Sequence, residues 1–306
     1  METLKFGTRG SALARRQTQL VIDDLTSRFP YIRCEVVVLQ TAGDRWQDRP
    51  IWNLGDKGVF VRPLEQALLD GRVDLAVHSL KDVPADDDAA GIGLVAFPQR
   101  EDARDVLISR NGGTLDALPQ EARVATGSLR RRMQLRSIRP DLVLVDVRGN
   151  VDTRLRKLDE GQYDALVLAA AGLKRLGLEE RVSEYFTVDR LVPDAGQGIL
   201  AIQGRAGDPA SDIVSVLDDE STRTCATAER STVRALGADC RSPVGVHAQV
   251  MGDRLFICAI AAADSESLAI SDRIEGKRVL AAGLGRELGE RLKEEILREL
   301  GTTSTS

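Results

Sequence analysis

Lys81 and Asp82 are the residues whose types and position most suggest chemistry. They follow residues 73–77, an apolar run that predicts a buried strand, and Pro84 ends any helix that could begin there. Ligands of open α/β sheets bind just beyond the carboxyl ends of the strands. A carboxylate beside an ammonium group can stay ionised there and hydrogen-bond a cationic or N–H-bearing substrate. The alternative is an ordinary salt bridge on a loop, because charge pairs also occur outside functional sites.

A second candidate site is basic and would bind anions. Residues 121–157 contain ten basic and four acidic residues, a local charge of about +6 in a protein whose net charge is −5. Thr126-Gly127-Ser128 is a predicted turn between a strand and a helix that begins Leu129-Arg130-Arg131-Arg132. Such a turn leaves the first backbone N–H groups of the helix available to an anion. Three consecutive arginines cannot all face one ligand, however, and any one of them could lie idle on the helix surface.

The strand–turn–helix pattern with basic turns recurs along the chain. Ser11 is a predicted N-cap after the first strand, and Arg9 in the same turn would add a bidentate charge or lie solvated. Arg148 and Arg154 follow a later strand, and Arg175 follows a small-residue turn at residues 170–172. We therefore expect these turns to converge on one anion-binding cleft.

The cysteines do not form a metal or disulfide pattern. Four cysteines are scattered without Cys-x-x-Cys spacing, and the chain has only two histidines, which argues against a zinc site. Cys34 and Cys258 fall in predicted strands and Cys225 in a predicted helix, where they would be core residues. Cys240 instead lies on a predicted loop beside Arg241, where it is either a reactive thiolate or an ordinary loop residue.

The bulk properties are those of an ordinary globular protein. The chain has 306 residues, enough for two or three domains, with 42% hydrophobic and 29% charged residues. No apolar run is long enough to cross a bilayer, and the N-terminus lacks a signal-peptide pattern, so we expect a cytoplasmic protein. The negative net charge argues against a general nucleic-acid binder. No interface stripe stands out, so we expect a monomer.

The periodicity predicts the elements that must position these residues. Residues 41–58 form a long predicted loop, either a lid or disordered, and Pro63 begins a helix. In the last helix Val279, Leu280, Leu284 and Leu288 begin an apolar face that ends before Gly301, a predicted C-cap. The predicted strands are residues 4–7, 35–39, 73–77, 91–97, 123–125, 143–147, 163–169, 199–202, 244–250 and 255–261, and further helices follow Ser11 and Ser128 and span 151–158 and 221–236.

Together these segments resemble the porphobilinogen deaminase (hydroxymethylbilane synthase) family over nearly the whole chain. Each motif is weak alone, but their order and spacing over more than two hundred residues are specific. The motifs are Gly7-Thr8-Arg9-Gly10-Ser11, Lys57-Gly58-Val59-Phe60, Val77-His78-Ser79-Leu80-Lys81-Asp82-Val83-Pro84, Arg100-Glu101-Asp102, Thr126-Gly127-Ser128-Leu129-Arg130-Arg131, Arg148-Gly149-Asn150-Val151-Asp152-Thr153-Arg154, Ala170-Ala171-Gly172-Leu173-Lys174-Arg175, Gly196-Gln197-Gly198 and Cys240-Arg241-Ser242-Pro243-Val244-Gly245.

The resemblance implies an α/β fold of three domains. Residues 1–98 with 198–216 and residues 103–192 would be two periplasmic-binding-protein-like α/β domains, joined by a double crossover, with the active site in their cleft. Residues 220–306 would be a small α+β domain whose cysteine, here Cys240, forms a thioether to a dipyrromethane cofactor. Such an enzyme is a transferase that links four porphobilinogen molecules head to tail, releases ammonia each time and hydrolyses the product from the cofactor.

The resemblance also implies a role for each matching residue. Asp82 would be the catalytic carboxylate that stabilises the azafulvenium cation left when porphobilinogen loses ammonia, while arginines bind the acetate and propionate groups of every ring. Cofactor contacts would come from Ser11, Lys81, Asp82, Thr126, Ser128, Arg130, Arg131 and Gln197; substrate or chain contacts from Arg9, Gln17, Arg148, Arg154 and Arg175; and a lid from Lys57 and Phe60.

Two departures and two rival interpretations accompany the resemblance. The family often has a basic residue where this chain has Asn53, and Lys-Glu where it has Arg62-Pro63, which bears on lid closure and rate. One rival is a non-catalytic anion-binding protein, which gives no role to Cys240 or Asp82. The other is a nucleic-acid regulator that uses the arginine cluster, which would show salt-sensitive DNA binding and which the net negative charge disfavours.

Overall fold

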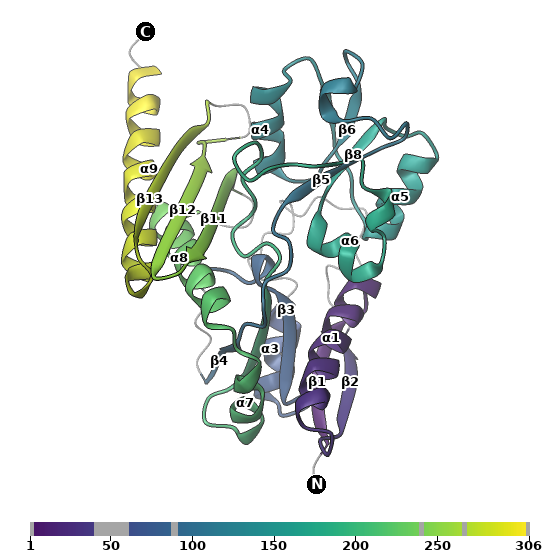
Figure 1. Ribbon diagram of the computed structural model, residues 1–306, viewed down its shortest axis with the longest axis vertical. Helices are drawn as coiled ribbons and strands as arrows, with labels where there is room; N and C mark the ends of the chain where they lie inside the picture. The colour runs from purple at the N-terminus through teal and green to yellow at the C-terminus, as the bar shows by residue number, and fades with distance from the viewer. Residues whose placement is uncertain (1–2, 40–60, 87–90, 239–241, 265–267, 304–306) are drawn as a thin grey trace. The chain divides into compact units, whose positions relative to one another are not determined.

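The computed structural model describes residues 3–39, 61–86, 91–238, 242–264 and 268–303 (Figure 1). The chain divides into two compact units, Met1–Glu101 with Gly198–Arg223, and Asp102–Gln197 with Thr224–Ser306. The chain thus leaves the first unit after Glu101 and returns to it at Gly198, which confirms the expected double crossover, and it leaves the first unit again after Arg223. The division of the second unit into two domains stays a prediction, although that unit contains two separate sheets.

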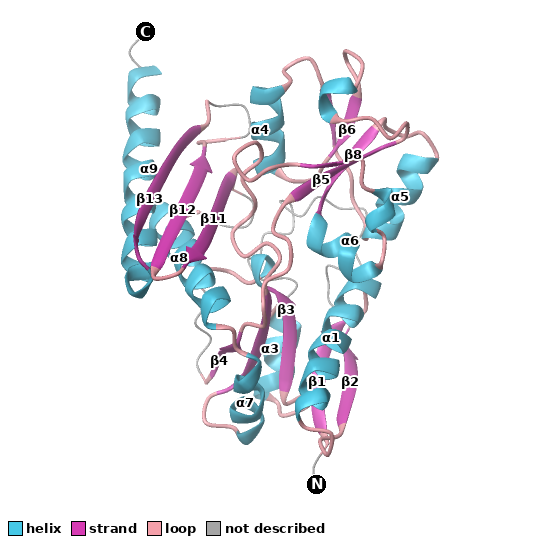
Figure 2. Cartoon of the chain, in the orientation of Figure 1, coloured by secondary structure: helices cyan, strands magenta, loops and turns pink. Residues whose placement is uncertain are grey.

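The first unit is built on a mixed sheet with the strand order β2-β1-β3-β10-β4. Strand β1 is parallel to β2 and β3, and all three are labelled in Figure 2. Strand β10, which follows the return crossing, is antiparallel to β3 and β4. Its elements are β1 (Leu4–Arg9), α1 (Ala12–Arg28), β2 (Cys34–Leu39), α3 (Arg62–Leu69), β3 (Leu75–Ser79), the 3₁₀ turn η2 (Leu80–Asp82), β4 (Ile92–Ala96), β10 (Leu200–Arg205), α7 (Pro209–Val214) and η5 (Ser215–Leu217).

Helices cover both faces of this sheet, which explains why its central strand β3 begins with a continuous apolar run, Leu75-Ala76-Val77, before the polar His78 and Ser79. Leu75 and Val77 of β3 share a buried cluster with Leu25 of α1. Ala76, which points to the opposite face, shares a second cluster with Leu64 of α3. Successive side chains of a strand point to opposite faces, so a strand covered on both sides reads as a continuous apolar run.

The second unit contains a five-stranded sheet with the order β7-β6-β8-β5-β9 and a three-stranded antiparallel sheet, β11-β12-β13. Leu166 of β8 packs toward α5 and Val167 toward α4, so helices cover both faces of the larger sheet. The elements of this unit are β5 (Asp105–Ser109), η3 (Leu115–Ala117), β6 (Arg123–Ala125), α4 (Leu129–Ile138), β7 (Val143–Val145), α5 (Val151–Asp159), β8 (Ala165–Ala169), α6 (Ala170–Leu176), η4 (Glu179–Arg181), β9 (Glu184–Tyr185), α8 (Glu220–Leu236), which begins in the first unit, β11 (Val244–Met251), β12 (Arg254–Ala261), β13 (Ile270–Lys277), η6 (Arg278–Leu280) and α9 (Ala281–Thr303).

The α/β class with a small antiparallel part is confirmed, but three local predictions are wrong. The strand expected at residues 73–77 is β3, two residues later, because the Val73 N–H bonds Ala67 O in the preceding turn although its side chain is buried. Ala170 begins α6 directly after β8, with no intervening turn. The last helix continues through Gly301, and Val279 and Leu280 are exposed because they lie on η6 before the helix.

Candidate functional site

The first candidate site lies at the carboxyl edge of the sheet in the first unit. Strands β1 and β3 are parallel, so Arg9 at the end of β1 and Asp82 on the turn after β3 reach the same edge. A pocket of about 60 Å³ opens there, enough for several water molecules or one carboxylate group. Its lining consists of Arg9, Ser11, Leu13, Ala14, Gln17, Val61, Val77, His78, Ser79 and Asp82.

Asp82 is held on a single 3₁₀ turn and remains accessible. The Leu80 N–H donates to Ile199 O at 3.0 Å and the Val83 N–H to Leu80 O at 3.0 Å, which fixes the turn at both ends. Asp82 Oδ2 lies 4.0 Å from Arg9 Nη1, and the Asp82 side chain is 40% exposed. An exposed pair at this distance stabilises the fold little, so the two side chains remain able to bind a ligand.

Other predicted residues of this edge have defined positions. The Ser11 hydroxyl caps α1 by accepting the Ala14 N–H at 3.2 Å, which confirms the expected N-cap. Gln17 is buried, and its amide donates to the Ser79 hydroxyl at 2.9 Å, at the end of β3. Lys81 is half-buried on the same turn as Asp82. The site roles of all three residues stay predictions.

A buried polar chain, not expected from the sequence, reaches the pocket through His78. Gln203 of β10 accepts from His78 Nε2 at 3.0 Å and donates its own Nε2 to Glu65 of α3 at 2.9 Å. Burial is the main reason that the pKa of His78 falls to about 4; Gln203 and Asp82 oppose that fall and Arg9 adds to it. His78 is therefore a neutral imidazole at neutral pH.

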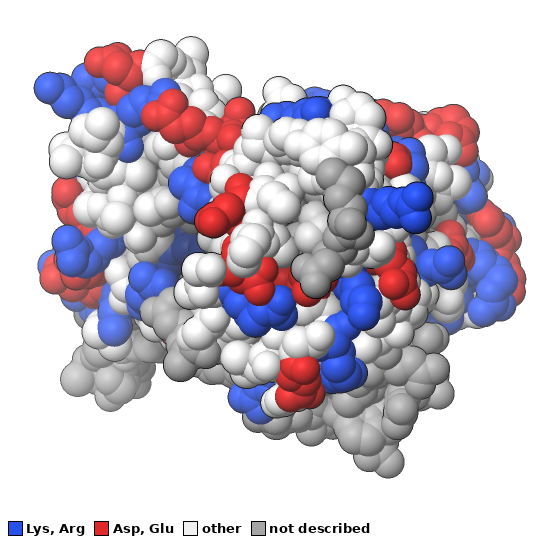
Figure 3. All heavy atoms as spheres, turned by 90° about the horizontal axis from the view of Figure 1, so that it is seen from below, with Lys and Arg blue, Asp and Glu red and all other residues white. Residues whose placement is uncertain are grey.

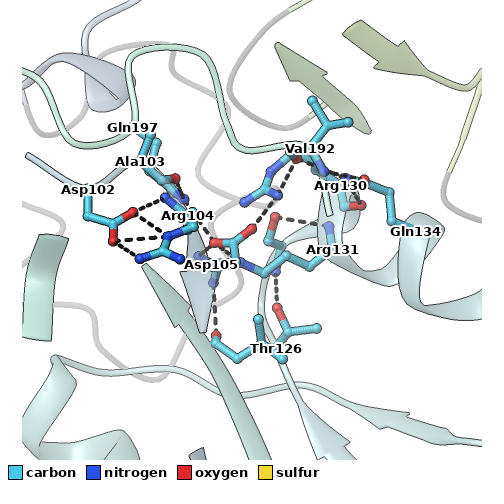
Figure 4. Close-up of polar contacts among 12 residues, drawn as sticks. Asp102, Ala103, Arg104, Asp105, Thr126, Arg130, Arg131, Gln134, Val192 and Gln197 are labelled. Carbon is cyan, nitrogen blue, oxygen red and sulfur yellow. Dashed lines mark hydrogen bonds and ion pairs between the residues drawn. The ribbon is translucent and has the colours of Figure 1, made fainter. Parts of the chain in front are cut away.

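The second candidate site, in the second unit, is organised around Asp105 at the start of β5. Figure 4 shows the Asp105 carboxylate between the side chains of Arg130, Arg131 and Gln197. Asp105 Oδ2 accepts from Arg130 Nη1 at 2.6 Å, and Asp105 Oδ1 accepts from Arg131 Nη2 at 2.7 Å and from Gln197 Nε2 at 2.9 Å. Burial would raise the pKa of Asp105, but the two guanidinium groups outweigh it and hold that pKa well below its usual range.

Helix α4 explains how two consecutive arginines reach one carboxylate. The Ser128 hydroxyl caps α4 by accepting the Arg131 N–H at 3.4 Å, and the Thr126 hydroxyl accepts the Ser128 N–H at 3.2 Å. Arg130 and Arg131 then extend inward to Asp105, whereas Arg132 pairs with Asp146 at 3.0 Å. Two of the three consecutive arginines thus bind one carboxylate and the third binds another, which agrees with the expectation that all three cannot face one ligand.

Further arginines gather near this cluster. Arg154 of α5 is half-buried and donates its Nε–H to Gly149 O at 2.8 Å. The pKa of Arg154 falls to about 10, mainly through burial and further through the charges of Arg131 and Arg148. Arg148 is half-buried as well. Like charges brought together at partly buried positions are typical of a site that binds an anion. Arg175 lies on α6 and is half-buried, and its role stays a prediction.

Three predicted residues lie outside the described residues: Cys240, Lys57 and Phe60. Asn53 lies outside them too, whereas Arg62 and Pro63 form the first turn of α3. Two polar residues of the sites were missed by the sequence analysis, namely Asp105 and His78. His78 could have been noticed because it belongs to the motif at residues 77–84. Asp105 lies at the start of a strand and belongs to none of the motifs.

Three broader features bear on other functions. Basic and acidic side chains are interspersed on the face of the molecule drawn in Figure 3, so that face has no large single-sign patch. Within the described ranges, no group of three or more His, Cys, Asp and Glu side chains is arranged to hold a metal ion. No helix among these residues is both long and apolar enough to cross a membrane.

Comparison with known proteins gives strong matches over most of the chain. Two family models match: "Porphobilinogen deaminase, dipyromethane cofactor binding domain" at residues 4–212 and "Porphobilinogen deaminase, C-terminal domain" at residues 223–298. The porphobilinogen deaminase of Roseiflexus castenholzii is 48% identical over 296 residues, 96% of each chain. That of Syntrophus aciditrophicus is 44% identical over 290 residues, 94% of each chain. Among solved structures, the methionine binding protein MetQ covers 70% of this chain and 89% of its own, at 14% identity and a TM-score of 0.46.

Proposed function

This chain belongs to the porphobilinogen deaminase family, and from that premise we propose that it is a hydroxymethylbilane synthase. It condenses four porphobilinogen molecules head to tail, releases one ammonia at each addition, and then hydrolyses the linear tetrapyrrole from a dipyrromethane primer on Cys240. The observation that carries the proposal is the match of both family domains, which together span residues 4–212 and 223–298. The cofactor itself is the one named in the first of these domains.

The residues around Asp105 fit a ligand rich in carboxylates. Arg130 and Arg131 together have more N–H donors than Asp105 accepts, and guanidinium groups match carboxylates in shape as well as charge. The Arg130 Nε atom is buried and has no hydrogen-bond partner among the residues that the structure describes. When bound, dipyrromethane supplies the pyrrole carbon to which the first substrate is joined. Arg130, Arg131, Thr126, Ser128 and the remaining proposed contacts, Ser11, Lys81 and Gln197, would hold its acetate and propionate groups.

Asp82 has the position and the exposure that the chemical step requires. The C–N bond of the protonated aminomethyl group of porphobilinogen breaks, neutral ammonia leaves with the electron pair, and the remaining azafulvenium is cationic. A carboxylate on a fixed turn stabilises that charge without reorganising. A new C–C bond then forms and the ring carbon that formed it loses its proton, which the carboxylate of Asp82 can accept.

The substrate's own carboxylates need partners near this carboxylate. Arg9 lies 4.0 Å from Asp82, between their closest charged atoms, and can bind the acetate or propionate group of a porphobilinogen whose pyrrole N–H faces Asp82. Gln17, Arg148, Arg154 and Arg175 complete the proposed set of contacts to the substrate and growing chain. Lys57 and Phe60 remain the proposed lid.

The intact mass of the purified protein tests this function. The protein should be heavier than its sequence by one dipyrromethane, and adding porphobilinogen should produce a ladder of further additions. Cys240→Ser should lose the extra mass, whereas the matched control Cys258→Ser, at a half-buried position of β12, should keep it. A wild-type protein that has no adduct, and acquires none from porphobilinogen, would rule out the proposal.

A further inference from the structure

Asp105 contacts three of the residues that the proposed function assigns to the cofactor. We propose that Asp105 is a positioning residue that holds Arg130 and Arg131 as one preassembled carboxylate-binding pair before the cofactor is present, and that Gln197 braces the Asp105 carboxylate from the other side. The inference rests on the proposed function and concerns residues of one unit only. It adds a residue, on β5, to which neither the motifs nor the family resemblance gave a role.

The contacts fix each guanidinium at more than one point. Arg131 donates Nε and Nη2 to Asp105 Oδ1, at 3.1 and 2.7 Å, and Nη1 to Val167 O at 2.9 Å. Arg130 donates Nη1 both to Asp105 Oδ2 at 2.6 Å and to Val192 O at 2.8 Å. Each planar group is thus held by one carboxylate and one backbone carbonyl, which leaves its orientation little freedom.

Gln197 is tied to the same carboxylate and to the segment before β5. Its Nε2 donates to Asp105 Oδ1 at 2.9 Å and to Ala103 O at 2.8 Å, and the whole residue is buried. The amide therefore cannot turn toward a ligand without releasing Asp105. The Asp105 carboxylate thus contacts Gln197, which lies in the segment before β10, as well as Arg130 and Arg131 on α4.

The balance of charge explains why such a support is needed. Arg130 and Arg131 are 3% and 7% exposed and Asp105 is fully buried; these three groups together have a net charge of +1, and the charge of Asp194 acts on Arg130 as well. Arg154 adds another positive charge nearby, close enough that Arg131 lowers the pKa of Arg154. Without Asp105, these guanidinium groups would repel one another and separate whenever no anion is bound.

A positioning role and a purely electrostatic role of Asp105 predict opposite changes in cofactor binding when its negative charge is removed. Removing a negative charge beside a ligand that carries several carboxylates should strengthen binding if only net charge matters. If positioning matters, Asp105→Asn should weaken binding although the site becomes more positive, because the guanidinium groups lose their shared acceptor. Asp105→Glu separates the two effects further, since it keeps the charge and moves the carboxylate by one methylene.

The test measures how much of the folded protein contains covalent dipyrromethane. Wild type, Asp105→Asn and Asp105→Glu are purified as folded protein by size exclusion, and the occupied fraction is read from the intact mass. We expect at least a fivefold lower occupied fraction in Asp105→Asn and a clear reduction in Asp105→Glu. The matched control Asp141→Asn breaks another bidentate arginine pair, with Arg139, in the same unit and should be fully occupied.

Each outcome decides the inference. If Asp105 only stabilises the fold, the yield of folded protein falls but every folded molecule is occupied, and the proposal is overturned. Full occupancy of folded Asp105→Glu overturns it as well, and this variant, which keeps the negative charge among the arginines, serves if Asp105→Asn does not fold. A wild-type protein without adduct would instead refute the proposed function, so the two failures are distinguishable.

Discussion

Replacing His78 should change how the stability of the protein depends on pH. His78 is a fully buried residue of β3, and its pKa is about 4 against an ordinary value of 6.5. Burial lowers this pKa, with Arg9 adding to the effect, while the hydrogen bond to Gln203 and the charge of Asp82 oppose it. Glu65 accepts a hydrogen bond from Gln203, which in turn bonds His78.

The hydrogen-bond chain also predicts which nitrogen of His78 carries the proton. The Glu65 carboxylate accepts, so Gln203 must turn its NH₂ group toward Glu65 and its oxygen toward His78. That oxygen can only accept, so His78 Nε2 must be the protonated nitrogen. Neutral His78 therefore has its lone pair on Nδ1.

The size of the effect follows from the two pKa values. Between pH 6.5 and pH 4 the unfolded chain protonates this imidazole and the folded protein does not, so folding is disfavoured as the pH falls. The stabilisation is fully present above pH 6.5 and is lost on acidification toward the folded pKa of about 4. A shift of this size corresponds to about 3 kcal/mol over the whole window, and to about 2 kcal/mol between pH 7 and pH 4.5.

Denaturant unfolding of wild type and His78→Gln at pH 7 and pH 4.5 measures this term. Glutamine does not titrate and can still donate to Gln203, so wild type should lose about 2 kcal/mol more than the variant over that interval. Carboxylates such as Asp105 contribute equally to both proteins and cancel. NMR of the imidazole nitrogens should show neutral His78 with a proton on Nε2 at pH 5.5. An imidazole that titrates near 6.5, or equal losses in the two proteins, would refute the reasoning.

Three further substitutions and one control substitution test the site and the packing. Asp82→Asn should keep the cofactor mass but turn over roughly a hundredfold more slowly, since a neutral amide cannot balance a cation; near-normal turnover would remove Asp82 from the mechanism. Arg148→Leu should stall elongation, seen as short additions in the intact mass, and product at the wild-type rate would contradict its role. Gly285→Ala places a Cβ 2.2 Å from Ala228 O and should lower the free energy of unfolding by about 2 kcal/mol. Gly283→Ala meets nothing within 4 Å and should raise it by up to about 1 kcal/mol, so equal midpoints would disprove the packing argument.

Local patterns predicted the elements whose hydrogen bonds are also local. Ser11 caps α1 because a hydroxyl just before an apolar period accepts a nearby backbone N–H, and Pro63 falls in the first turn of α3 because its missing N–H is not needed there. The burial expected for apolar residues predicted the first residue of a strand less well. Val73 is buried, yet its N–H bonds the turn before β3, so the apolar run began two residues before the strand.

Strand β13 shows a second limit of the sequence pattern. Its residues alternate between half-buried and exposed, and none is fully buried, so the run Ile270–Lys277 lacks the apolar signal of a strand. It forms because β12 offers a complete antiparallel ladder of eight residue pairs. The pairing partner, which no local pattern reports, decides the structure of this segment.

The two polar residues missed in the sites have the same physical origin. Residues that touch a ligand lie at turns beyond strand ends, where small and charged residues form recognisable runs, so Arg9, Asp82 and Arg131 could be selected from the sequence. A residue that holds such a side chain is buried, and its partners are distant in the chain: 26 residues separate Asp105 from Arg131 and 125 separate His78 from Gln203.

Replacing a residue that positions other side chains should therefore have a different effect from replacing a residue that contacts the ligand. Asp82 faces a pocket and supports no buried charge, so Asp82→Asn should leave the protein folded and loaded but slow. Asp105 is an acid inside a group of arginines, so Asp105→Asn should lower the occupied fraction of the folded protein while the molecules that remain occupied still turn over. The comparison of the two variants by occupied fraction and by turnover per occupied molecule decides the matter, because a single electrostatic role for both carboxylates predicts the same pattern in each.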